Sequence, residues 1–236
     1  MLLEVCVEDS AGLAAAIAGG ADRIELCSAL AIGGLTPSTG LMLEAGRQDL
    51  PCYAMIRPRA GDFVWTADDM AVMLDDIEMA RRAQLAGVVL GASLPDARLD
   101  SDGLQRLVAH ATGLGLTLHR AFDLVPDRQE AIDIAIDLGF ERILTSGGKT
   151  TAVEGIDELE RLIALAADRI SIMPGAGINP QTIGTLIPRL PVREIHASCS
   201  LAVTEPDQRL VALGFSPAIR RRTDSATIRT LKAMLV

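Results

Sequence analysis

The sequence predicts an α/β protein built as one (β/α)8 TIM barrel domain over residues 1–236. Short β-type runs alternate with amphipathic or Ala-rich segments from end to end, at the strand spacing of roughly 25–30 residues that is typical of this barrel. An open doubly wound sheet has the same alternation, but no G-x-G-x-x-G motif follows the first strand. Aromatic residues make up only 3% of the chain and hydrophobic residues 49%. A core of short aliphatic side chains suits parallel strands that are covered by helices.

Eight strands are expected, each a short apolar-rich run. They are Leu2–Val7, Arg23–Leu26, Cys52–Arg57, Gly87–Gly91, Leu116–Ala121, Arg142–Ser146, Arg169–Met173 and Glu194–Cys199. The helical pattern, with apolar residues three and four apart, fills the segments between them. The expected helices are Ser10–Gly19, Pro37–Asp49, Ala67–Ala86, Asp100–Gly113, Asp127–Gly139, Glu154–Ala167, Gln181–Pro188 and Ser225–Leu235.

Several helix boundaries carry chemical signals. Thr36 before Pro37 is typical of an N-cap with proline at the first helical position. Thr66 precedes a helix whose first turn holds two aspartates, which the helix dipole favours there. Glycines are expected where helices end, at Gly113, Gly115 and Gly139.

Charge and composition disfavour several classes of function. The formal net charge of −9 repels phosphate backbones, so nucleic acid is not an expected partner. The basic run Arg220–Arg222 is expected in a solvated loop or a helix lead-in. The N-terminus has no basic run, and no apolar stretch of about 18 residues predicts a membrane span. Four scattered cysteines match no zinc-finger spacing and indicate reduced thiols in the cytoplasm.

Ionisable and polar groups share one face of most predicted strands. Residues two apart point the same way, which pairs Glu4 with Cys6, Glu25 with Cys27, Met55 with Arg57, Thr117 with His119, Ile143 with Thr145, and His196 with Ser198. The other face is mostly apolar and suits the helix-facing side. Because an unpaired charge in a packed barrel costs several kcal/mol, these groups must pair or reach solvent. They lie near strand C-termini, where barrel enzymes hold their sites. Arg142 opens its strand and is expected at the surface.

These residues belong to a series of motifs that resembles the CutC family of copper-homeostasis proteins. The motifs follow in family order along nearly the whole chain: Glu4-Val5-Cys6, Arg23-Ile24-Glu25-Leu26-Cys27, Gly33–Ser38, Met55–Arg59 with Gly61-Asp62-Phe63, His119–Asp123, Leu144–Gly148, Gly175–Ile178 and Glu194–Ser198. One departure lies at 173–177, where a more continuous glycine run is expected. The resemblance implies a cytoplasmic barrel that is associated with copper tolerance and proposed to bind Cu(I). Cys6 and Cys27 match the cysteines to which that proposal applies.

Copper binding is the first functional hypothesis. Soft thiolates select Cu(I), and Cys6 and Cys27 lie on adjacent strands about 4.8 Å apart. A dedicated copper carrier would be expected to expose closely spaced cysteines, whereas these lie beside carboxylates in a lumen. Cys52 and Cys199 are expected to be packing residues.

The second hypothesis is an enzyme that acts on a small anionic substrate. Glu4 and Glu25 would serve as general acid and base, and His119 and His196 would relay protons or bind a metal. The expected substrate-binding residues are Arg57, Arg59, Arg120, Asp123, Thr145 and Ser198, in which the arginines clamp a carboxylate or a phosphate. The glycine turns at 147–148 and 175–177 would offer backbone N–H groups to a phosphate.

A non-catalytic scaffold barrel is the third hypothesis. The mean hydropathy of +0.31 is high and indicates apolar surface that an oligomer would cover. A homodimer is therefore expected.

Overall fold

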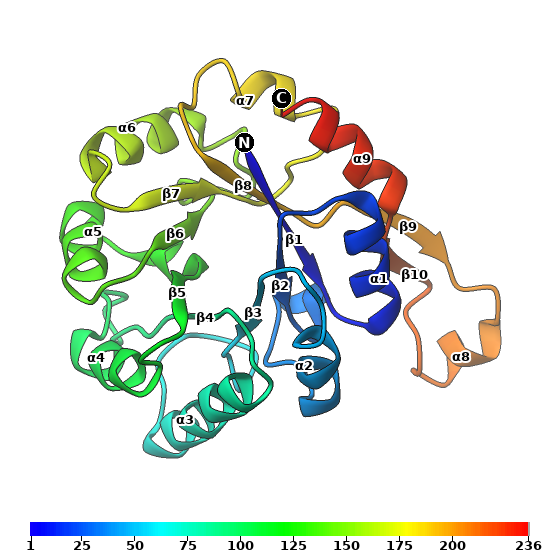
Figure 1. Ribbon diagram of the computed structural model, residues 1–236, viewed down its shortest axis with the longest axis horizontal. Helices are drawn as coiled ribbons and strands as arrows, with labels where there is room; N and C mark the ends of the chain where they lie inside the picture. The colour runs from blue at the N-terminus through cyan, green and yellow to red at the C-terminus, as the bar shows by residue number, and fades with distance from the viewer. Residues whose placement is uncertain (236) are drawn as a thin grey trace.

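Residues 1–235 are described by the computed structural model, which forms a barrel of parallel strands surrounded by helices (Figure 1). Eight strands make one sheet in the order β7-β6-β5-β4-β3-β2-β1-β8. They are β1 (Leu2–Val7), β2 (Arg23–Leu26), β3 (Cys52–Met55), β4 (Gly87–Leu90), β5 (Gly115–Leu118), β6 (Arg142–Thr145), β7 (Ser171–Pro174) and β8 (Glu194–Ala197). β7 and β8 lie side by side and bring the sheet to near closure. The predicted (β/α)8 fold class is confirmed.

The helices ring the strands in sequence order (Figure 1). They are α1 (Ser10–Gly19), α2 (Thr39–Ala45), α3 (Ala67–Arg82), α4 (Ser101–His110), α5 (Arg128–Asp137), α6 (Ile156–Ala166), α7 (Ile183–Leu186) and α9 (Ser225–Ala233). α9 packs beside α1 near the chain's two ends. This contact needs a glycine, because a Cβ on Gly19 would lie 2.6 Å from Cβ of Ile228. No helix within residues 1–235 has the length and apolar character that crossing a bilayer requires.

The helix caps match the sequence signals only in part. Thr66 forms a full capping box with Asp69 at the start of α3, as its position predicted. The prediction for Thr36 was wrong: Ser38 caps α2 instead, because Thr36 Oγ1 already accepts a hydrogen bond from the backbone N–H of Arg57. Gly115 opens β5 rather than ending a helix.

A projecting arm, which no sequence pattern predicted, interrupts the barrel between β8 and α9. β9 (Ser200–Thr204) and β10 (Ile219–Thr223) form an antiparallel hairpin that carries the short helix α8 (Gln208–Ala212), at the right of Figure 1. The arginines of 220–222 lie on the exposed strand β10, so their expected place in a loop or a helix lead-in was wrong.

The barrel has an apolar outer layer and a partly polar lumen. Outward side chains such as Val5, Ile24 and Leu26 are fully buried against the helices. All four cysteines are buried free thiols, and Cys52 and Cys199 pack in this core as expected.

The facing predicted for β6 was wrong. Arg142 pairs in register with Thr117 of β5, so both side chains face the lumen, where the guanidinium donates to Thr117 Oγ1 at 2.9 Å. Ile143 belongs to the outer core instead. Arg142 is therefore 8% exposed and not a surface residue.

Candidate site at the barrel mouth

A cavity of about 490 Å³ opens at the C-terminal ends of the strands. The predicted site residues that line it are Cys6, Glu25, Arg57, His119, Arg120, Asp123, His196 and Ser198. Four other predicted site residues do not line the cavity and can affect it only through neighbouring side chains: Glu4, Cys27, Arg59 and Thr145. The mouth location is the one expected from the strand C-termini.

His196 stands at the centre of one wall of the cavity. Its Nδ1 lies 2.8 Å from Oε1 of Glu4, and its Nε2 lies 3.8 Å from Oε2 of Glu25. One ligand atom each from Cys6, Glu25 and His196 all lie within 4.8 Å of one another, and the three side chains are buried. The sheet brings them together, because β1 lies between β2 and β8 and Cys6 pairs in register with Glu25.

The pKa values of the two glutamates at this wall, Glu4 and Glu25, are shifted in opposite directions. Burial alone would raise the pKa of Glu4, but the hydrogen bond and positive charge of His196, together with Arg23, lower that pKa to about 2. Burial raises the pKa of Glu25, and the nearby charge of Glu4 adds to this effect. Glu25 Oε1 is also a buried oxygen without a hydrogen-bond partner among the described residues.

His196 is held as a cation between these carboxylates. Burial opposes its charge, but the charge of Glu25 and the hydrogen bond to Glu4 outweigh burial and raise its pKa well above the usual value. An ion pair of His196 with Glu4 therefore fills this wall when no ligand is bound.

Cys27 lies behind the wall rather than on it. Its Sγ donates to Oε2 of Glu25 at 3.5 Å, and the side chain packs against Tyr53, Met55 and Val89. Burial, followed by the negative charge of Glu25, raises the pKa of the Cys27 thiol well above its usual range. The candidate ligand atoms that converge at this wall belong to one cysteine, one histidine and one glutamate.

A second wall of the cavity contains Arg57 and His119, with the half-buried ring of Phe63 packed against both. The Arg57 guanidinium carbon lies 5.0 Å from the centre of the Phe63 ring, and the His119 ring centre lies 4.7 Å from it. Both residues retain a buried nitrogen without a partner within residues 1–235, Nε of Arg57 and Nε2 of His119.

Asp123 organises the loops after β5 and β6. Its carboxylate accepts hydrogen bonds from Arg120 Nε at 2.7 Å, Thr145 Oγ1 at 2.6 Å and the backbone N–H of Gly148 at 2.9 Å. Gly147 donates its own N–H to Thr145 Oγ1. The expected use of this glycine turn for phosphate is therefore disfavoured, because its N–H groups are already engaged.

Arg59 stabilises the loop after β3 instead of facing the cavity. It forms ion pairs with Asp62 at 3.0 Å and Asp69 at 3.1 Å, and its guanidinium lies over the Trp65 ring. Ser198 lines the mouth, where its hydroxyl lies 3.0 Å from that of Ser200.

The bottom of the lumen holds a charged cluster that the sequence reading did not include. Arg23 forms ion pairs with Glu4 and Glu194, and Arg142 lies 3.2 Å from Glu194. The signal was present, since Arg23 has the same strand parity as Glu25, and Glu194 the same parity as His196.

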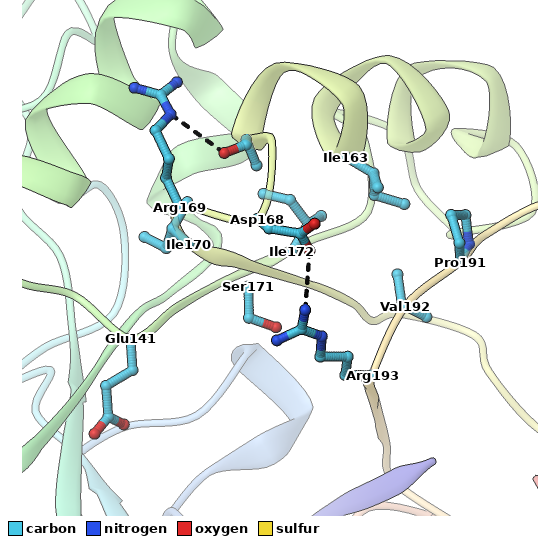
Figure 2. Close-up of a pocket in the computed structure, with 11 residues that line it drawn as sticks. Glu141, Ile163, Asp168, Arg169, Ile170, Ser171, Ile172, Pro191, Val192 and Arg193 are labelled. Atoms are coloured by element: carbon cyan, nitrogen blue, oxygen red, sulfur yellow. Dashed lines mark hydrogen bonds and ion pairs between the residues drawn. The ribbon is translucent and has the colours of Figure 1, made fainter.

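A smaller hollow of about 210 Å³ lies at the other end of the barrel, by α6 and the starts of β7 and β8 (Figure 2). Its charged residues are exposed, and Figure 2 shows Arg193 paired with Asp168, at 3.1 Å. Exposed pairs of this kind are screened by water, so the hollow lacks the buried polar groups that distinguish the mouth.

Comparison with known proteins agrees with this fold. The family model described as CutC family matches residues 1–201, which include all eight barrel strands but not α9. The chain belongs to the CutC family. A family protein CutC from Sinorhizobium medicae is 63% identical over 235 residues, covering 100% of this chain and 96% of that protein. A CutC relative from Rhizobium meliloti is 64% identical over 233 residues, with coverage of 99% and 95%.

A solved CutC structure has the same fold. The crystal structure of a putative copper homeostasis protein CutC from Streptococcus agalactiae matches with a TM-score of 0.80 at 32% identity. The match covers 84% of this chain and 98% of that one.

Proposed function

We propose that this CutC protein serves copper homeostasis by binding a copper ion through Cys6, Glu25 and His196. The observation that carries the proposal is the convergence of sulfur, oxygen and nitrogen ligand atoms within 4.8 Å at the edge of an open cavity. Thiolate and imidazole are ligands that copper accepts, and Cu(I) favours the thiolate.

The surroundings of His196 support a ligand role. A metal-binding histidine usually donates its second ring nitrogen to a carboxylate, which fixes the ring. Glu4 provides this contact at Nδ1, 2.8 Å away, and leaves Nε2 directed toward Glu25. Glu25 also retains an oxygen without a hydrogen-bond partner in the described chain.

The chain's own groups would exchange protons for the ion. His196 gives up the proton on Nε2 and Cys6 gives up its thiol proton, while Glu4 keeps the imidazole oriented. Cys27 stays protonated and holds Glu25 through its S–H group. We therefore assign Cys27 a supporting role instead of direct ligation.

Anaerobic titration with Cu(I) against a chromogenic chelator tests the site. Wild-type protein is expected to bind one ion per chain, and the double variant Cys6→Ser with His196→Gln is expected to lose that binding. Cys52→Ser is the matched control, because Cys52 is a buried thiol that lies outside the mouth. Full Cu(I) binding in the double variant would overturn the proposal.

A second candidate function is an enzyme that uses acid–base chemistry in the same mouth. The specific observation is the pair of glutamates whose pKa values are pushed apart, one lowered and one raised. Glu25 would then transfer a proton and Glu4 would hold the charge of His196. A metabolite that stabilises the wild type in a thermal-shift screen, and no longer does so in Glu25→Gln, would favour this function.

The same proposal places the protein in the cytoplasm as a homodimer. Four free thiols fit the reducing cytoplasm. The arm exposes Leu213, Phe215 and Ile219, with 69%, 78% and 64% of their surfaces accessible, and a homodimer would cover such apolar side chains. Sedimentation of the wild type and of Phe215→Ser would test the dimer.

A further inference from the structure

We propose that the wall formed by Arg57 and His119 binds the carboxylate group of a small metabolite. This site lines the same cavity as the proposed copper ligands, and it does not depend on the ion. Four features of the wall support it: spare donors, a charge without a counterion, a neutral imidazole and donors arranged for a planar carboxylate.

Arg57 is positioned by the backbone and still has donors left. Three of its five N–H groups donate to carbonyl oxygens, those of Ile32 at 2.9 Å, Gly34 at 3.1 Å and Gly61 at 3.0 Å. Nε remains without a partner although it is buried. The guanidinium is therefore fixed in place before any ligand arrives, which lowers the entropic cost of binding.

The charge of Arg57 has no counterion in the described part of the chain. Arg57 is 6% exposed and forms no ion pair within residues 1–235, whereas Arg59 and Arg120 of the neighbouring loops pair with aspartates. A buried cation without a partner is costly. An anionic ligand would remove that cost.

His119 offers a neutral N–H donor on the same wall. Its Nδ1 accepts a hydrogen bond from the backbone N–H of Ala121 at 3.2 Å, so the ring proton lies on Nε2. Burial, together with the positive charge of Arg57, lowers the pKa of His119 to about 3 and keeps the ring uncharged at neutral pH. Nε2 is buried and unpartnered, as Nε of Arg57 is.

The remaining donors suit a carboxylate better than a phosphate. A planar carboxylate takes two parallel N–H groups from a guanidinium, and the imidazole adds a third. A phosphate in a barrel usually needs backbone N–H groups from glycine turns. Here the turn at 147–148 has given those groups to Thr145 and Asp123, and in the turn at 175–177 the N–H of Gly175 donates to the carbonyl oxygen of Thr145.

Trp65 lies close enough to the proposed site to report ligand binding through its fluorescence. It is the only tryptophan of the chain, and its ring lies edge-on to that of Phe63 at 6.1 Å. Because Phe63 packs against both Arg57 and His119, a carboxylate bound to their buried nitrogens would lie close to this ring. The fluorescence of Trp65 should therefore change on binding.

Fluorescence titrations on chelator-treated, metal-free protein test the proposal with acetate, pyruvate and succinate as probes. At least one probe is expected to give saturable binding that Arg57→Gln weakens by roughly 10- to 100-fold, the effect of losing a charge-assisted hydrogen bond. Arg98→Gln, which removes an exposed arginine paired with Asp96 outside the cavity lining, should bind as the wild type does. No saturable response to any probe, equal affinity in Arg57→Gln, or tighter binding of inorganic phosphate would overturn the proposal.

A second measurement uses the wild-type protein, so it remains informative even if Arg57→Gln does not fold. The imidazole Nε2–H resonance of His119 should move downfield in ¹H–¹⁵N spectra when the probe saturates the site, because that proton gains an acceptor. An unmoved resonance at saturation would overturn the proposal. Since both experiments exclude metal, a failed copper titration would leave this result standing, and the reverse also holds.

Discussion

The bottom and the mouth of the lumen contain the same kinds of buried charge in opposite states. At the bottom, Arg23 contacts Glu4 and Glu194, and Arg142 contacts Glu194 and Thr117. At the mouth, Glu25, Arg57 and His119 are equally buried, yet each keeps a polar atom without a partner in the described chain. Burial alone therefore does not distinguish these two regions of the lumen, but hydrogen-bond satisfaction does.

Glu4 and His196 lie at the boundary between the two regions. Glu4 uses one carboxylate oxygen for Arg23 below and the other for His196 above. The paired bottom thus fixes the orientation of a mouth residue. This arrangement stabilises the fold and positions the site through one side chain.

The largest expected effect tests whether the charged cluster at the bottom of the lumen stabilises the fold. Arg23→Met should lower the free energy of unfolding by roughly 3 to 5 kcal/mol, because it removes the buried cation that Glu4 and Glu194 share. Urea denaturation at neutral pH measures the loss, with the exposed-pair variant Arg98→Met as the control. A change in Arg23→Met as small as that of the control would show that the cluster is not structural.

At the mouth, His119 should make the free energy of unfolding depend on pH. The pKa of His119 is about 3 in the folded protein and 6.5 when unperturbed. Between these values the unfolded chain binds more protons, so stability rises with pH across the window and is lost as pH falls. From pH 6.5 to about 4.5 the His119 contribution should fall by about 2 to 3 kcal/mol.

Urea unfolding of wild type and His119→Gln at both pH values isolates this contribution. Other acidic groups titrate in both proteins, so only the difference between the two pH dependences is assigned to His119. Parallel pH dependences would mean that His119 is charged or solvated in the folded state.

The sequence predicted the fold and most of the mouth for one physical reason, the period-two alternation of strands. That period placed Glu25, His119 and His196 on the lumen side correctly, since the apolar opposite face fixed which parity is buried. The same rule failed on β6, where the opposite parity combined an arginine with a leucine and gave no clear apolar face. Only the register with Thr117 reveals that Arg142 faces inward.

Other features depend on contacts that no local pattern encodes. Thr36 has the chemistry of a cap, but its hydroxyl is used by a neighbouring strand. The arm follows β8 with an exposed hairpin whose pairing, Ser200 with Thr223, spans a helix and two loops. The hydrogen bond from Cys27 Sγ to Glu25 Oε2 is likewise a contact that strand parity does not specify.

The smallest effect on stability should come from Glu25→Gln. This variant tests most directly whether a buried group at the mouth differs from the paired groups at the bottom of the lumen. Burial raises the pKa of Glu25, so above its unperturbed pKa of 4.5 the folded state binds protons more tightly than the unfolded chain does. Stability is therefore lost as pH rises through the raised pKa. Removing this charge should change the free energy of unfolding at neutral pH by no more than about 1 kcal/mol, and toward greater stability.

Glu4→Gln is the matched control, the same substitution one strand away. Glu4 carries two ion pairs and a lowered pKa, so its loss should destabilise the protein as a broken buried pair does. Glu25→Gln should instead weaken Cu(I) binding while the fold is kept. If both variants lose stability equally, the unpartnered oxygen of Glu25 belongs to the structural cluster, and the mouth must be defined without it.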